Sequence, residues 1–126
     1  RRTMPGERPD EVLREFERIL DELREREGDV RASLEQMLER PGTEVPEESR
    51  LVQGLLRAGQ KHGISPVVEG MTAWVDAALL NEVGIPAVCY GPGDIAQAHS
   101  ADEWVEVEQI QKCADVLESF ARDLAT

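Results

Sequence analysis

The sequence predicts an α/β fold, in which helices alternate with short strands. Several stretches carry apolar residues at helical spacing and end at a glycine, as amphipathic helices do. By contrast, Val30–Leu38 opens with apolar and polar residues in alternation, the pattern of a half-buried strand. Ile85–Tyr90 is a continuous apolar run, which is typical of a strand buried on both faces. Helical stretches between such strands indicate parallel units with right-handed crossovers.

The first part of the chain is predicted to form a strand, a helix and a second strand. Residues 1–4 would end the first strand, because Pro5-Gly6 is a strong turn signal. Pro9 suits the first turn of a helix, and Gly28 suits its end. Val30–Leu38 follows as the second strand. The apolar residues of the helix recur at helical spacing: Val12, Phe16, Ile19, Leu20 and Leu23.

The second part begins after residues 40–46, which hold two prolines and a glycine and are the predicted domain boundary. A helix that ends at Gly63 is followed by a short strand, Pro66–Glu69, and a short helix, Trp74–Val83, which is ended by Gly84. We expect this short strand to pair in parallel with Ile85–Tyr90, and a last helix to pack on the sheet. The apolar face of that last helix comprises Ile110, Cys113, Ala114, Leu117, Phe120, Ala121 and Leu124.

Composition and charge exclude several classes of partner. The formal net charge is −12, and no basic patch offsets it, which argues against nucleic acid and anionic membranes as partners. No apolar run approaches the ~18 residues that a membrane span requires. Cys89 and Cys113 are too few for a disulfide scaffold and lack the spacing of metal ligands. We therefore expect both to be buried, reduced thiols in a cytoplasmic protein.

The stretch from Gly91 to Val105 carries His99, one of two histidines in the chain. It follows the predicted buried strand, and ligands of α/β sheets bind at the carboxyl ends of strands. A neutral imidazole is a common metal ligand, and Asp94, Asp102 or Glu103 could orient it. The alternative is a surface histidine, because a zinc site needs at least three protein ligands and no second histidine lies at ligand spacing.

Five further side chains have structural interpretations, and Arg2 also has a functional one. Arg2 could bind a carboxylate through its guanidinium, or be an ordinary surface charge. His62 lies at a predicted helix end, where a cation interacts favourably with the helix dipole. Asp76 lies at a predicted helix start, where a carboxylate does the same. Trp74 and Trp104 are interpreted as packing residues.

In combination, these stretches resemble the C-terminal portion of one enzyme family. They are RRTMPGE, the acidic amphipathic helix after it, and GMTAWVDAALLNEVGIPAVCYGPGDIAQAHSADEWVEVEQI, in collinear order. The family comprises zinc-dependent amidohydrolases and peptidases, including acetylornithine deacetylase, succinyl-diaminopimelate desuccinylase and glutamate carboxypeptidases. The resemblance covers nearly the whole chain, and its most specific part is the block GIPAV, GPG and AHS-x-DEWV.

The resemblance implies roles for individual residues. In the family, a Gly-Pro-Gly loop leads to an Ala-His-Thr or Ala-His-Ser triplet whose histidine binds the second metal ion. This implies that His99 is a metal ligand and that the loop before it contacts the substrate through Gly91, Pro92 and Gly93. The family's lid has a strand that ends Arg-x-x-Pro-Gly, whose arginine holds the substrate carboxylate. Arg2 takes that position here.

One position departs from the family pattern. The usual Thr-Asp-Ala before the penultimate helix appears here as Val75-Asp76-Ala77. The threonine hydroxyl is therefore missing, and with it a polar group that could contact the substrate.

The family also implies an architecture, an activity and cofactors. Residues 1–45 would be the C-terminal half of the lid, or dimerisation, domain, with a strand–helix–strand order. Residues 46–126 would be a C-terminal βαβ segment of the zinc-hydrolase catalytic domain. The complete enzyme would cleave an amide bond of N-acyl amino acids or small peptides. It would use two divalent ions, zinc or in its place cobalt or manganese, to polarise the carbonyl and supply a hydroxide.

The remaining metal ligands and the general base belong to the N-terminal part of the family, so no catalytic residue is expected within this chain. The chain opens on Arg1 rather than methionine, which fits a truncation. We expect the isolated chain to be inactive and to bind no zinc tightly. Lids of the family pair into homodimers, and an unpaired edge at Val30–Leu38 would favour a dimer or a strand-exchanged oligomer.

Two alternatives come from other functional classes. The chain could be a non-catalytic binding or interaction module derived from the same fold. It could also be an unrelated acidic α/β interaction domain. An upstream reading frame that encodes His-x-Asp and Glu-Glu would favour the enzyme, whereas a start codon directly before Arg1 would favour the module.

Overall fold

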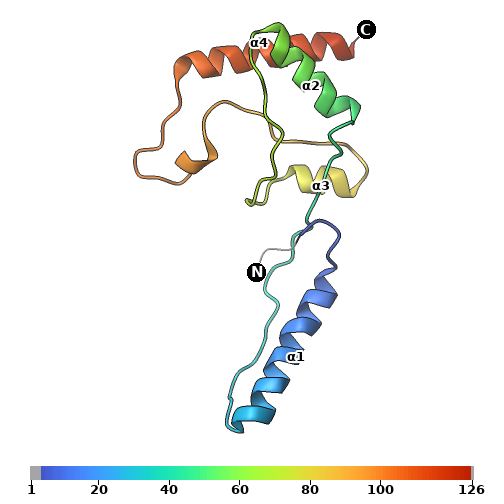
Figure 1. Ribbon diagram of the computed structural model, residues 1–126, viewed down its shortest axis with the longest axis vertical. Helices are drawn as coiled ribbons and strands as arrows, with labels where there is room; N and C mark the ends of the chain where they lie inside the picture. Colours follow the sequence, from blue (N-terminus) through green and yellow to red (C-terminus); the bar gives the residue numbers. More distant parts are fainter. Residues whose placement is uncertain (1–3, 126) are drawn as a thin grey trace. The chain divides into compact units, whose positions relative to one another are not determined.

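The computed structural model describes residues 4–125 (Figure 1). Its contacts divide the chain into two compact units, each described by itself below. Unit 1 comprises residues 1–44 and 71–85, and unit 2 comprises residues 45–70 and 86–126. The helical elements are, in chain order, α1 (Pro9–Glu27), α2 (Arg50–Lys61), α3 (Ala77–Glu82), the 3-10 helix η1 (Ile95–Gln97) and α4 (Val107–Leu124).

Unit 1 is built on α1, which confirms the predicted first helix. Pro9 occupies the first turn, and Gly28 ends the helix at φ 72°, with its N–H bonded to the Arg24 carbonyl at 2.9 Å. The chain then turns back and runs beside α1 (Figure 1). Arg24 Nη2 donates to the Ala32 carbonyl at 2.7 Å, which ties this returning segment to the helix. No side chain of α1 is completely buried.

Unit 2 is built on the pair α2 and α4, which pack against each other. Ser49 caps α2, since its Oγ accepts from the Val52 N–H at 3.3 Å. Lys61 Nζ and Asp123 Oδ2 form an ion pair at 2.7 Å between the two helices. The buried apolar side chains of this unit are Val52, Leu55, Ala58 and Val116. The first and the last helix predicted for the second part are thereby confirmed.

Two glycines end their helices by the same hydrogen-bond pattern. Gly63 and Gly84 have φ of 70° and 80°, a left-handed backbone that glycine adopts without a steric penalty. The next residue in each case bonds back five positions: Ile64 N–H to the Gly59 carbonyl and Ile85 N–H to the Leu80 carbonyl, both at 2.9 Å. This is the Schellman motif, which satisfies carbonyls at a helix end. Both glycines were predicted as helix stops.

The prediction of an α/β fold is wrong. Residues 4–125 contain no strand, so neither the strand–helix–strand half nor the βαβ segment is present, and α4 packs on α2 rather than on a sheet. The predicted strands Val30–Leu38, Pro66–Glu69 and Ile85–Tyr90 are irregular segments. A strand is stable only beside partners that bond its backbone and cover its apolar face. Here Met37 is 89% exposed and Ile85 54% exposed, so that cover is lacking.

Three smaller predictions also have outcomes. The predicted strand at residues 1–4 lies mostly outside the described residues. Both cysteines are free thiols, but Cys89 is exposed and Cys113 half-buried, so the prediction that both are buried is wrong. None of the helices within residues 4–125 has both the length and the apolar character to cross a bilayer.

Candidate functional site

The loop that carries His99 lies in unit 2 and links the segment 86–90 to α4. It opens with a tight bend at Gly93, whose φ is 93°. Asp94 then caps η1, because its Oδ1 accepts from the Ala96 N–H at 2.9 Å. This local use of a carboxylate is the usual role of aspartate at a helix start. It orders the loop directly before His99.

His99 occupies a type II turn. Ala98 has φ −58° and ψ 132°, His99 has φ 64°, and the Ser100 N–H bonds the Gln97 carbonyl at 3.1 Å. These values match the two central positions of that turn type, the second of which favours glycine. The residue is exposed to solvent. The imidazole is therefore presented from a tight turn at the surface of unit 2.

Besides Asp94, two further side chains bond the backbone of this loop. Gln109, in the first turn of α4, accepts from the Gly93 N–H at 2.8 Å through its Oε1. Glu103 accepts from the His99 N–H at 3.3 Å through its Oε2. The contact of Glu103 fixes the backbone of His99 and does not involve its imidazole ring. Orientation of the imidazole ring by a nearby carboxylate stays a prediction.

The described part of the chain does not supply a complete metal site. Across residues 4–125, no group of three or more His, Cys, Asp or Glu side chains is arranged to hold a metal ion. Asp94 and Glu103, two of the carboxylates near His99, use an oxygen to bond backbone N–H groups. His99 can therefore offer one ligand, whereas a closed site needs three or four.

A pocket of about 250 Å³ lies on the same loop. Trp104 and Gln109 contribute to its lining together with Gly93 and Gln97, whereas His99 lies outside that lining. Trp104 was interpreted as a packing residue, but its side chain is exposed at the pocket rather than buried. The pocket and the imidazole are thus separate features of one loop.

The other predicted residues lie elsewhere. Arg2 is outside the described residues. The turn signal after it is confirmed, since the Glu7 N–H bonds the Met4 carbonyl at 3.1 Å across Pro5-Gly6. His62 is the C-cap of α2, as expected for a histidine at a helix end. Asp76 directly precedes α3 but forms no capping hydrogen bond through its side chain.

Sequence reasoning missed the side-chain contacts that order each unit. In unit 1, the Arg40 guanidinium lies over the Trp74 ring, 5.0 Å from its centroid. In unit 2 it missed the backbone contacts of Glu103 and Gln109. Only the four-residue spacing between His99 and Glu103 offered a signal, and that spacing alone does not distinguish a contact with the ring from a contact with the backbone.

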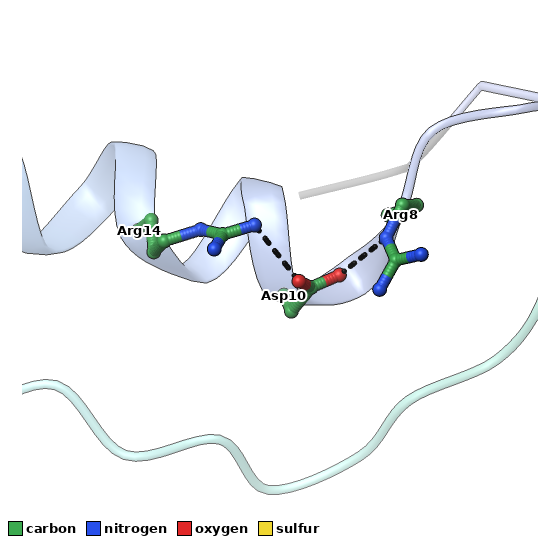
Figure 2. Close-up of polar contacts among 3 residues, drawn as sticks. All are labelled: Arg8, Asp10 and Arg14. Atoms are coloured by element: carbon green, nitrogen blue, oxygen red, sulfur yellow. Dashed lines mark hydrogen bonds and ion pairs between the residues drawn. The ribbon is translucent and has the colours of Figure 1, made fainter.

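The start of α1 carries the clearest electrostatic cluster. Figure 2 shows the Asp10 carboxylate between Arg8 and Arg14, at 3.0 Å from Arg8 Nε and 2.8 Å from Arg14 Nη2. The hydrogen bond from Arg8 lowers the pKa of Asp10, and the charges of both arginines act in the same direction. All three side chains are exposed, so the cluster is typical of a solvated helix start.

Tyr90 is the titratable group nearest the loop with a shifted pKa. Burial raises the pKa of its hydroxyl, and an electrostatic interaction with Cys113 adds to the increase. The phenol is therefore neutral at physiological pH, so Tyr90 carries no charge next to the start of the loop at Gly91.

Comparison with known proteins identifies the family. The model of peptidase family M20/M25/M40 matches residues 5–123. An acetylornithine deacetylase from Myxococcus xanthus is 32% identical over 92% of this chain and 29% of its own length. An N-acetyl-L-citrulline deacetylase from Xanthomonas campestris is 47% identical over 37% of this chain and 13% of its own length. A putative succinyl-diaminopimelate desuccinylase from Mycobacterium tuberculosis is 36% identical over 64% of this chain and 20% of its own length.

No solved structure shows significant similarity to the chain. The chain spans less than a third of the length of each of these three relatives, at most 29%. Since the family model covers nearly all of it, the predicted resemblance is confirmed: the chain belongs to peptidase family M20/M25/M40.

Proposed function

We propose that the protein to which this chain belongs is a metal-dependent hydrolase that cleaves an amide bond of N-acyl amino acids or small peptides. The observation that carries the proposal is the family match over residues 5–123. The names of two relatives, acetylornithine deacetylase and N-acetyl-L-citrulline deacetylase, support removal of an acyl group from an amino acid.

Within this chain, we assign His99 as a metal ligand of that enzyme. Its exposed imidazole on a tight turn supports the assignment, since a ligand must be open to groups from other segments. The remaining ligands would come from other parts of the longer protein. Those ligands would also determine whether the metal is zinc, cobalt or manganese. We also propose that residues 1–45 belong to a lid domain and 46–126 to the catalytic domain, and that the enzyme acts in the cytoplasm.

The test is turnover of N-acetyl- and N-succinyl-amino acids by the longer protein that contains this chain. His99→Ala should lower kcat/KM by ~100-fold or more, since even indirect partners of metal ligands cost 10–100-fold when removed. His62→Ala is the matched control, because His62 closes α2 outside the loop, and it should keep normal turnover. Near-normal turnover of His99→Ala would show that His99 is not a metal ligand of the enzyme. Submicromolar zinc affinity of the isolated chain would show a complete local site.

A further inference from the structure

Two residues of the His99 loop have a left-handed backbone, and a side chain bonds the N–H of each. Gly93 has φ 93° and donates to Gln109 Oε1 at 2.8 Å. His99 has φ 64° and donates to Glu103 Oε2 at 3.3 Å. Both acceptors follow the turn in sequence and come from outside it. The two bends of the loop are therefore places where side chains from further along the chain hold its backbone.

The backbone of His99 is the more informative of the two. Among residues 4–125 it is the one non-glycine residue with positive φ. At the second central position of a type II turn, glycine avoids a steric penalty that any β-carbon incurs. A residue with a side chain persists there only when the surrounding contacts determine its conformation. The strain fixes the direction in which the imidazole leaves the chain.

We propose that Glu103 and Gln109 are positioning residues that hold the imidazole of His99 in its orientation. Glu103 acts directly, through the His99 N–H. Gln109 acts at the other bend, through the Gly93 N–H. The consequence for catalysis rests on the proposed function, but the positioning itself is a property of this chain.

The two contacts differ in what they anchor. A carboxylate that accepts from a backbone N–H makes a charge-assisted bond, and Glu103 reaches back four residues to do so. Gln109 belongs to α4, the helix whose Val116 is buried in the core of unit 2. Gln109 thus connects the start of the loop to a packed helix. A functional side chain keeps one geometry when the backbone that carries it is bonded to residues that are themselves held by packing.

The experiment is NMR spectroscopy of the 126-residue chain and five variants. A residue with positive φ gives a strong nuclear Overhauser effect between its own amide and α protons. Glu103→Ala should weaken this signal at His99 severalfold, whereas Glu103→Gln, which keeps an acceptor oxygen, should retain it. Gln109→Leu should change the amide shift of Gly93 and weaken the His99 signal, and Gln109→Glu should restore both. Asp102→Ala, which removes a neighbouring carboxylate, should leave the signal unchanged.

Helical circular dichroism from α2 and α4 verifies that each variant is folded, and Glu103 is exposed, so its replacement leaves the core intact. The inference is overturned if the His99 signal persists in both Glu103→Ala and Gln109→Leu. In the longer protein, Glu103→Ala should lower kcat about tenfold with KM nearly constant, and Glu103→Gln should recover it. Normal turnover of His99→Ala would contradict only the assignment of His99 as a metal ligand, since the NMR result does not depend on activity.

Discussion

Helices α1 and α4 have 19 and 18 residues and are equally amphipathic, yet they differ in burial. α4 buries Val116 completely, whereas α1 buries no side chain completely. The difference lies in what covers each apolar face. α4 packs on a second helix, α2, whereas α1 has an irregular returning segment beside it. A helical pattern thus indicates which face is apolar but not whether the chain supplies a cover for it.

Small residues on α2 explain why its contact with α4 is close. A methyl group built on Gly54 would lie 2.6 Å from the Phe120 ring of α4, so this ring packs directly on the α2 backbone. Ala58 is fully buried on the same helix. Close packing of this kind gives dispersion contacts that an irregular segment cannot match.

The largest expected effect comes from a charge at the centre of the covered helix. Val116→Asp should unfold unit 2, because an unpaired buried carboxylate costs several kcal/mol and a small domain has only ~5–15 kcal/mol of stability. Circular dichroism during urea unfolding measures this. The matched control is Leu117→Asp, one residue further on α4 and 43% exposed, which should cost about 1 kcal/mol. Similar losses in both variants would break the contrast between covered and uncovered faces.

A smaller effect is expected at Gly59. An alanine in a helix is normally about 1 kcal/mol more favourable than glycine. Here the added methyl group would lie 2.5 Å from Cγ of the rigid Pro66 ring, so we expect a net loss of about 1–2 kcal/mol in the free energy of unfolding. Gly70→Ala, where the same group meets no atom within 4 Å, should be neutral or slightly stabilising. A more stable Gly59→Ala variant would show that Pro66 moves freely.

The elements that were predicted well are those whose signals are local. Helix starts and stops at Pro9, Gly28, Gly63 and Gly84 depend on a few neighbouring residues, and the structure has them. The strands failed because a strand also needs partners distant in sequence. The apolar run Ile85–Tyr90 indicates a segment suited to burial on two faces, but the described residues offer no sheet to bury it.

The candidate site shows the same division. His99 was found from the residues around it and the resemblance they carry. Its left-handed backbone was not predicted, because histidine at that turn position contradicts the usual preference for glycine. The contact from Gln109 was also missed, since it joins residues 16 positions apart. Such contacts depend on how the loop folds against α4, which composition and periodicity do not encode.

The uncovered face of α1 leads to a prediction about assembly. We propose that the chain self-associates as a homodimer, because Phe16 and Ile19 are 37% and 40% exposed and a second copy could cover them. Strand exchange no longer has a basis, since Val30–Leu38 forms no strand. Light scattering should report a dimer for the wild type and a shift toward monomer for Phe16→Glu. Val12→Glu, on a half-buried residue of the same helix, tests whether the effect follows exposure. A wild type that stays monomeric at high concentration contradicts the proposal.

The smallest expected effect concerns pH and the start of α1. The hydrogen bond from Arg8 lowers the pKa of Asp10 below its ordinary value of 3.8, so the folded helix favours the charged carboxylate. This stabilisation is present above pH 3.8 and is lost as the pH falls through the lower folded pKa. Wild type should therefore be slightly more helical than Asp10→Asn at pH 7, and the difference should vanish in stronger acid.

Circular dichroism at 222 nm across a pH titration measures this difference, and a matched pair in α4 sharpens it. The hydrogen bond from Lys112 likewise lowers the pKa of Glu108. Exposed pairs of this kind contribute little to stability, so their effect is visible only where a helix end is free to fray. The first turn of α4 is tied to the preceding loop by the hydrogen bond from the Gly93 N–H to Gln109, so Glu108→Gln should change helicity less than Asp10→Asn does. An equal change in both variants would show that this bond does not protect the start of α4. A difference for Asp10→Asn that persists unchanged at low pH would show that the carboxylate charge is not its cause.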